Sequence, residues 1–397
     1  MRHLHIATAE EGEKELIRIG VDPYGIETMV PKMEKFNLLL EDIVCKVANI
    51  LKQEALSVGG DVAVARGAVD CSVERTDALI IGNVKQMRAL AQKLSIQPFG
   101  LRKIAEDIGT VLNNLARHSF QLTTPRRTME IGSKTLVMGI LNVTPDSFSD
   151  GGRFEDTEAA IEFGAAMEEA GADIIDVGGE STRPGSSPVS QEEELHRVIP
   201  VIRVLAGRLA VPISIDTRKA EVAEEALKAG AEIVNDVSAL TFDEEMKSVV
   251  AHHGVPVVLM HMRGTPLTMQ EGSLSYRSLR GDIICFLETR IADGERAGIH
   301  GEQIIIDPGL GFGKSLEDNL RIIKYLSEFK VLGRPIMVGV SRKRFIGGVT
   351  GGEPKDRLEG AAAAVTGAIM QGAHIVRVHD VRFMKRVSVM VDALMRC

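Results

Sequence analysis

Eight short apolar segments of the chain terminate in polar residues, and all eight lie after residue 130. Each segment is rich in β-branched residues, which favours a strand. Buried polar groups must be paired or put to use, so a set of them at one mouth indicates a site for a polar ligand. The segment ends carry the following residues: Asn142, Asp176, Asp216, Asn235, His261, Asp307, Ser341 to Arg344 and Arg377 to Asp380.

These polar residues fall into two chemical groups. Asp216, Asn235 and Asp307 offer carboxylate and amide groups, which suit a flat heterocycle with several N–H donors. Cationic and donating side chains suit an anion, and His379 can donate from either ring nitrogen. This second group consists of Arg183, Lys343, Arg377 and His379. The pattern predicts a site for a heterocycle next to a site for an anion.

Three residues with oxygen ligands follow the first apolar segment, namely Asn142, Asp146 and Asp150. Hard oxygen ligands next to an anion site suit Mg²⁺, which commonly binds protein oxygens and phosphate oxygens at the same time. We therefore expect Mg²⁺ as the cofactor. Glycines at 151–152, 178–179 and 309–313 permit close backbone approach and loop motion around such a ligand.

Strand-like and helical segments alternate from Thr135 onward, as in βα units around a parallel sheet. The expected strands are 135–142, 172–177, 211–216, 231–237, 255–262, 304–307, 335–341 and 374–380. The expected helices are 157–170, 190–208, 219–230, 242–253, 278–298, 316–329, 356–371 and 381–395. This order matches a (β/α)₈ barrel, whose active sites lie at the carboxyl ends of its strands. A doubly wound open sheet is the alternative, but no Gly-x-Gly-x-x-Gly follows the first strand.

The first part of the chain has a different pattern and no chemical motif. Apolar spacing predicts a long helix over 32–57, which Gly59 and Gly60 end. A strand over 77–81 and helices over 84–94 and 99–117 follow. We expect a smaller α/β domain with a structural or regulatory role over 1–122, a linker over 123–134 and the barrel over 135–397.

Composition excludes several classes of protein. With 44% hydrophobic and 26% charged residues, the chain is globular in composition. Aromatic residues make up only 4%, which argues against base-stacking nucleic-acid binding, and the net charge of −8 lies wholly within 131–397. The four cysteines lack metal or disulfide spacing. No apolar run is long enough for a membrane span and no signal peptide is visible, so we expect no membrane partner and a cytoplasmic location.

Six strings in the barrel region together resemble the dihydropteroate synthases of folate biosynthesis. They are LNVTPDSFSDGG at 141–152, GESTRPG at 179–185, IDTR at 215–218, DPGLGFGK at 307–314, SRK at 341–343 and RVHD at 377–380. All stand in the family's order, and the resemblance covers about 131–397. The preceding extension resembles the longer forms of some prokaryotes, and no role follows for it.

The resemblance implies a (β/α)₈ fold, a reaction and a set of site residues. The family joins 6-hydroxymethyl-7,8-dihydropterin diphosphate to p-aminobenzoate, forming 7,8-dihydropteroate and pyrophosphate. The implied pterin residues are Asp216, Asn235, Met260, Asp307 and Lys343. The implied diphosphate residues are Asn142, which also binds Mg²⁺, with Thr182, Arg183, Arg377 and His379. The implied p-aminobenzoate residues are Phe148, Pro184, Phe312, Lys343 and Arg344, and Asp146 and Asp150 belong to the first loop. Arg344 stands where some members carry a small hydroxyl residue. A homodimer is also implied.

Two other functions stay open at this point. A pterin-dependent corrinoid methyltransferase shares the pterin-binding positions Asp216, Asn235 and Asp307. It needs no diphosphate clamp, which is the set of implied diphosphate residues. A catalytically inactive pterin-binding protein would be expected to have lost the clamp. The complete set of clamp residues favours the synthase over both.

Overall fold

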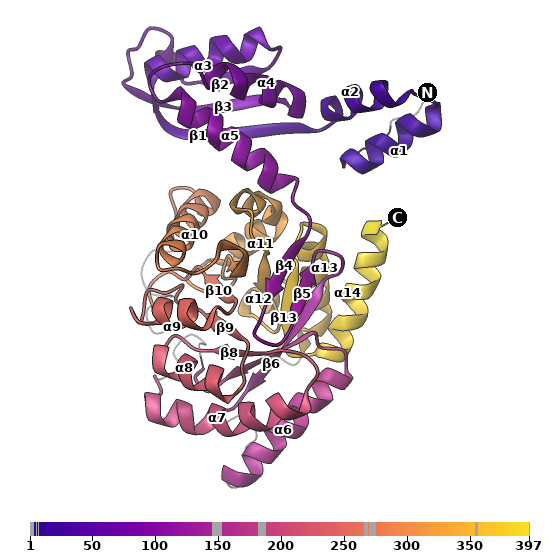
Figure 1. Cartoon of the computed structure of the whole chain (residues 1–397), viewed down its shortest axis with the longest axis vertical. Helices are drawn as coiled ribbons and strands as arrows, with labels where there is room; N and C mark the ends of the chain where they lie inside the picture. The colour runs from indigo at the N-terminus through magenta and orange to yellow at the C-terminus, as the bar shows by residue number, and fades with distance from the viewer. Residues whose placement is uncertain are drawn as a thin grey trace. The chain divides into compact units, whose positions relative to one another are not determined.

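A computed structural model of the chain describes residues 4, 6, 8–144, 153–181, 188–265, 269, 275–353 and 356–396, with only the backbone of 153–156. The chain forms two compact units, Met1–Ala116 and Arg117–Cys397. Each has its own hydrophobic core, so each is described by itself. The elements of both units are labelled in Figure 1.

The first unit contains an antiparallel sheet with the strand order β1-β3-β2. Its strands are β1 (Lys35–Val44), β2 (Asp61–Val64) and β3 (Arg75–Asn83). Its helices are α1 (Ala9–Ile19), α2 (Pro23–Met33), α3 (Cys45–Ser57), α4 (Val84–Leu94) and α5 (Leu101–Leu115), with a 3₁₀ turn η1 at Arg66–Ala68. Leu51 of α3, Ile80 of β3 and Leu90 of α4 are buried together in its core. Amphipathic helices over one face of a sheet therefore make this small α/β unit.

The helix predicted over 32–57 is wrong in its first half. Residues 35–44 form strand β1, and α3 begins only at Cys45. Along β1 the side chains alternate between exposed and half-buried up to Leu40, the period of a strand. Pairing with β3, in which Leu39 lies opposite Leu79, overrides the helical spacing of the apolar residues. The helix predicted over 84–94 is confirmed, and an Asn83–Gln86 capping box marks its start.

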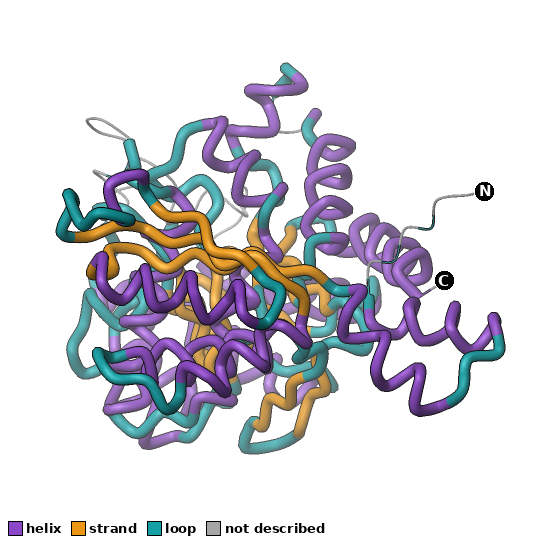
Figure 2. Tube along the Cα trace, turned by 90° about the horizontal axis from the view of Figure 1, so that it is seen from above, coloured by secondary structure: helices purple, strands orange, loops and turns teal. Residues whose placement is uncertain are grey.

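The second unit is a closed parallel barrel. Its strands are β6 (Leu136–Asn142), β7 (Ile174–Gly178), β8 (Ile213–Asp216), β9 (Ile233–Asp236), β10 (Val257–Met260), β11 (Ile304–Asp307), β12 (Met337–Gly339) and β13 (Ile375–Val378). They follow one another from β6 to β11, and β13 pairs with both β12 and β6. A parallel bridge between Ile306 and Ile336 joins β11 to the start of β12 and closes the ring. The predicted (β/α)₈ barrel is confirmed. Figure 2 colours the helices of the chain purple and its strands orange.

Helices follow the strands around the barrel (Figure 1). They are α6 (Arg153–Glu169), α7 (Gln191–Arg208), α8 (Ala220–Ala229), α9 (Met246–His253), α10 (Leu279–Arg296), α11 (Leu316–Lys324), α12 (Arg344–Thr350), α13 (Leu358–Met370) and α14 (Val381–Arg396). Two 3₁₀ segments, η3 (Gly301–Gln303) and η4 (Leu326–Leu332), complete the unit. Helix α12 was not expected from the sequence, and the helix expected over 316–329 ends at Lys324 and continues as η4. Ser190 and Ser315 cap their helices as predicted, each accepting a backbone N–H.

A hairpin occupies the region where a linker was expected. Strands β4 (Phe120–Thr123) and β5 (Thr128–Ile131) pair antiparallel. Their apolar side chains form one cluster with residues of seven barrel strands: Phe120, Leu122, Ile131, Leu136, Met138, Ile174, Ile233, Val258, Ile305, Met337 and Ile375. Arg127 forms an ion pair with Glu232, which directly precedes β9, at 2.8 Å. The hairpin therefore packs at the amino ends of the strands, belongs to the barrel unit, and leaves the carboxyl ends for a site.

Candidate functional site

The predicted strand-end residues meet at one end of the barrel. Asp216 lies opposite Asn235 in the register of β8 and β9, and Met260 lies opposite Asp307 in that of β10 and β11. These four residues are at most 6% exposed. Because the strands are parallel, their carboxyl ends share one mouth, and the side chains form its buried floor.

Arg377 of β13 reaches the carboxylates of two other strands. Its Nε donates to Oδ2 of Asp176 at 2.6 Å, and its Nη2 donates to Oδ2 of Asp216 at 2.5 Å. The Asn235 amide also donates to Oδ2 of Asp176, at 3.0 Å. The four residues form one hydrogen-bonded network across the barrel interior.

The electrostatics of this network follow from burial. Burial raises the pKa of Asp216 to about 7, although Arg377 lowers it, and the neighbouring Asp176 raises it further. Burial works against the charge of Arg377, but Asp176 and Asp216 outweigh it and hold the pKa of the guanidinium above its usual range. Arg377 is therefore a permanent cation, whereas Asp216 can change its charge near neutral pH.

Two acceptors of this network have no hydrogen-bond partner in the described part of the chain. Oδ1 of Asp176 and Oδ1 of Asp216 are buried and make no hydrogen bond with the described residues. A buried carboxylate oxygen without a donor is costly, so both atoms are positioned to receive N–H groups of a ligand. Asp176 was not among the predicted site residues. The signal for it was a carboxylate inside an otherwise apolar strand, Ile174–Gly178.

Asp307, Lys343 and Phe312 form the neighbouring part of the mouth. Oδ1 of Asp307 accepts the backbone N–H of Gly309 at 2.7 Å, and burial raises the pKa of this carboxyl against the effect of Lys343. Burial lowers the pKa of Lys343 to about 8, against the effect of Asp307. The Lys343 ammonium donates to the carbonyl of Leu310 and lies 4.6 Å from the centre of the Phe312 ring. The structure thus brings these three predicted residues together.

Three further predicted residues, Asn142, His379 and Arg344, lie at or just beyond the ends of barrel strands. Asn142 ends β6 and is half-buried, opposite Gly178 in the register with β7. His379 follows β13, and its Nδ1 lies 3.2 Å from Oγ of Ser341. Arg344 is exposed at the first position of α12, directly after Lys343. Within the described residues, no group of three or more His, Cys, Asp or Glu side chains is arranged to hold a metal ion. The predicted residues Asp146, Phe148, Asp150, Thr182, Arg183 and Pro184 lie outside the described residues.

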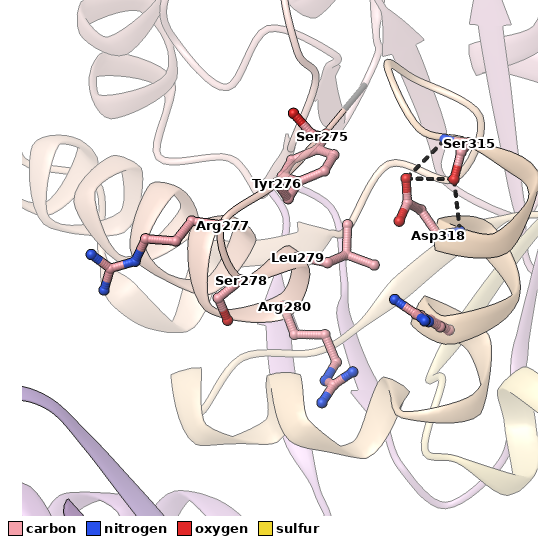
Figure 3. A pocket seen from close by; sticks show the side chains of 9 residues that line it. Ser275, Tyr276, Arg277, Ser278, Leu279, Arg280, Ser315 and Asp318 are labelled. Carbon is pink, nitrogen blue, oxygen red and sulfur yellow. Dashed lines mark hydrogen bonds between the residues drawn. The ribbon is translucent and has the colours of Figure 1, made fainter. Parts of the chain in front are cut away.

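A cavity of about 500 Å³ lies beside the starts of α10 and α11. None of the predicted site residues lines it. Figure 3 shows Asp318 bonded to Ser315, its capping partner, while Arg277 points away from this pair. Arg280 is paired with Glu328 at 2.5 Å, so its charge is already compensated. The cavity therefore contributes nothing to the strand-end site.

Comparisons with known proteins agree with this geometry. The family model described as pterin binding enzyme matches residues 138–379. The dihydropteroate synthase of Synechocystis sp. is 49% identical over 266 residues, which cover 67% of this chain and 92% of that protein. A probable bifunctional folylpolyglutamate synthase/dihydropteroate synthase of Halobacterium salinarum is 40% identical over 379 residues, or 95% of this chain and 45% of that protein.

The fold comparison gives the same result for the barrel. The structure of Xanthomonas albilineans dihydropteroate synthase with 4-aminobenzoic acid is 44% identical, with a TM-score of 0.66. It covers 70% of this chain and 99% of that one. The chain therefore belongs to the pterin binding enzymes and, among them, to the dihydropteroate synthases.

Proposed function

We propose that the barrel joins 6-hydroxymethyl-7,8-dihydropterin diphosphate to p-aminobenzoate, which gives 7,8-dihydropteroate and pyrophosphate. This is an alkyl transfer in folate biosynthesis. The observation that carries it is the buried set of Asp216, Asn235 and Asp307 toward the carboxyl ends of the strands, together with Asp176 inside β7. Acceptors without donors in such a place fit a heterocycle rich in N–H groups.

The pterin ring would lie among Asp216, Asn235, Asp307, Lys343 and the side chain of Met260. Both carboxylates that hold Arg377 do so through Oδ2, and their Oδ1 atoms have no partner among the described residues. A pterin can therefore donate to Oδ1 while the two ion pairs stay intact. This arrangement binds the ring without the cost of leaving a buried charge unpaired.

The diphosphate would bind at the mouth above the ring. Nη1 of Arg377 makes no hydrogen bond with the described residues, so it can donate to a phosphate oxygen. His379 extends beyond the end of the same strand. With Thr182 and Arg183 as sequence predictions, these groups would make a local cationic site in a barrel whose net charge is −8.

Catalysis would rest on electrostatics and positioning. The bond between the pterin methylene carbon and the diphosphate oxygen breaks, and its electron pair leaves with pyrophosphate. Arg377 and His379 stabilise that negative charge, while Asp216 and Asp307 favour the positive charge on the pterin. The amine nitrogen of p-aminobenzoate then bonds to the carbon and loses a proton. An aromatic amine is neutral near pH 7, so no strong general base and no covalent nucleophile are needed.

We propose Mg²⁺ as the cofactor. Among the residues that the structure describes, Asn142 would bind the ion through its side-chain oxygen. Mg²⁺ commonly keeps several waters and binds through few protein groups together with substrate phosphates. A half-buried amide oxygen at the end of β6 suits such a site, and Asp146 and Asp150 stay sequence predictions. When bound, the ion would neutralise charge on the diphosphate.

The p-aminobenzoate would lie against Phe312 and Lys343. The Phe312 ring and the Lys343 ammonium are already in contact, and Arg344 is exposed directly after Lys343. We propose that Arg344 pairs with the benzoate carboxylate, a role that a guanidinium suits. Phe148 and Pro184 would complete this part of the site.

We also propose a homodimer that forms through the outer helices. Helices α13 and α14 pack on each other and expose large apolar side chains, namely Met370, Phe383, Val389, Met390, Leu394 and Met395. Exposed apolar residues that gather on one pair of helices mark an interaction site. No helix of the described residues is long and apolar enough to cross a membrane.

The test is product formation by the purified chain with both substrates and Mg²⁺. We expect 7,8-dihydropteroate and pyrophosphate, and loss of both products in Arg377→Ala. Methyl transfer from a methylated pterin to a corrinoid protein is the control for the alternative enzyme. Methyl transfer without pyrophosphate release would overturn the proposal.

A further inference from the structure

Lys314 is a buried lysine that the proposed reaction does not use. It ends the loop between β11 and α11 and is 3% exposed. Its Nζ lies 2.9 Å from Nδ1 of His261, 3.3 Å from the carbonyl oxygen of His261 and 3.1 Å from that of Phe312. An ammonium has three N–H donors, and here each can meet one acceptor. Within the described residues Lys314 makes no salt bridge at ion-pair distance.

The surroundings of Lys314 and His261 determine which of the two side chains carries a proton on the shared hydrogen bond. Burial and the neighbouring Lys314 hold the pKa of His261 well below its usual range, so its ring is neutral. Nδ1 then serves as an acceptor, with the ring proton on Nε2. Burial lowers the pKa of Lys314 to about 7, and Asp307 opposes this. Only the charged form of Lys314 can donate to all three acceptors.

These three hydrogen bonds join two parts of the site. His261 directly follows Met260, the last residue of β10, and its backbone N–H donates to the carbonyl of Asp307. Phe312 lies in the loop after β11 and touches Lys343. Lys314 therefore links the backbone of Phe312 by hydrogen bonds to His261, at the end of the neighbouring strand β10.

The loop between β11 and α11 packs closely against the end of β10, so a change in its position would cost stability. A Cβ at Gly309, whose φ is +71°, would lie 1.9 Å from the carbonyl oxygen of His261. The backbone N–H of Gly311 donates to the buried Asn319 at 2.6 Å. The side chain of Tyr276 donates to the carbonyl of Gly313 at 2.9 Å. Lys314 adds three hydrogen bonds from one buried ammonium to these contacts.

We propose that Lys314 is a positioning residue for p-aminobenzoate, whose ammonium holds Phe312 in place beside Lys343. The inference rests on the proposed function. It assigns to Lys314 an effect on the second substrate and none on the dihydropterin diphosphate, because neither Nζ nor its three acceptors belong to the pterin floor.

The experiment compares Lys314→Met with Lys330→Met in the full chain. Lys330 is another largely buried lysine whose pKa is lowered by burial, and it lies near Gly372 and His374, before the amino end of β13. In Lys314→Met the KM for p-aminobenzoate should rise about tenfold, the effect of one buried hydrogen bond to a charged group. The KM for dihydropterin diphosphate should stay within about threefold in both variants, which is under 1 kcal/mol.

A second pair of variants keeps the inference testable if Lys314→Met does not fold. His261→Asn retains an acceptor near the place of Nδ1, whereas His261→Leu removes it. We expect the KM for p-aminobenzoate to rise in His261→Leu and to stay near the wild-type value in His261→Asn. Equal rises for both substrates, or a lower melting temperature with unchanged KM values, would overturn the inference. A wild-type chain without turnover would instead refute the proposed function.

Discussion

Replacement of Arg377 by alanine tests the buried network at the floor of the barrel. The substitution removes the cation from Asp176 and Asp216, which are 0% and 6% exposed. Removal of one partner of a buried ion pair commonly costs about 3–5 kcal/mol, since the remaining charge has lost its compensation. We therefore expect loss of turnover together with a marked loss of stability near pH 8.

The size of this loss should depend on pH. Asp216 has an ordinary pKa of 3.8, and its pKa in the folded chain is about 7. Between these values the folded chain keeps a proton that the unfolded chain has lost, so the free energy of unfolding falls as the pH rises. Arg377 lowers the pKa of Asp216, so its removal raises that pKa and extends the fall above pH 7. Each additional pKa unit corresponds to about 1.4 kcal/mol.

The assay is urea unfolding at pH 6 and pH 8.5, followed by far-ultraviolet circular dichroism because the chain has no Trp. The difference in unfolding free energy between wild type and Arg377→Ala should be larger at pH 8.5 by about 1.4 kcal/mol or more. Arg208→Ala is the matched control, since Arg208 pairs with Glu162 on the surface and should change little at either pH. A difference for Arg377→Ala that is the same at both pH values would show that Arg377 does not set the pKa of Asp216.

Three further predictions follow from other parts of the barrel. Asp307→Asn should weaken dihydropterin binding by about tenfold or more while pyrophosphate binding stays unchanged; calorimetric titration with each ligand checks this, and equal losses would indicate general damage. Leu122→Ala, at a fully buried residue of the β4–β5 hairpin, should cost about 2–5 kcal/mol of stability without changing either KM; a changed KM would contradict the separation of hairpin and site. Met390→Glu on the exposed face of α14 should convert a dimer to a monomer in light scattering, and an unchanged mass would exclude that face as the interface.

Local sequence was sufficient for the barrel and for much of its floor. Asp216 and Asp307 each end a four-residue strand whose residues are all buried, so the sequence positions of these carboxylates coincide with the mouth. The N-caps at Ser190 and Ser315 likewise depend only on neighbouring residues. Such features are predictable because they involve contacts within a few positions of the chain.

Features that depend on distant contacts were missed. Strand β1 has apolar residues at both strand and helix spacing, and only its pairing with β3 decides between them. The β4–β5 hairpin contains Pro125 and two strands of four residues, and its apolar side chains are explained only by the barrel end that they cover. The carboxylate partners of Arg377 lie 161 and 201 positions away in the chain, so its ion pairs with Asp216 and Asp176 were not predicted from the sequence.

The most direct test of the central claim is the stoichiometry of the reaction. The purified chain is incubated with 6-hydroxymethyl-7,8-dihydropterin diphosphate, p-aminobenzoate and Mg²⁺, and 7,8-dihydropteroate and pyrophosphate are quantified together. We expect equal amounts of both products, and neither product when p-aminobenzoate is omitted. Tight binding of the pterin without any product, by a folded chain, would contradict this expectation.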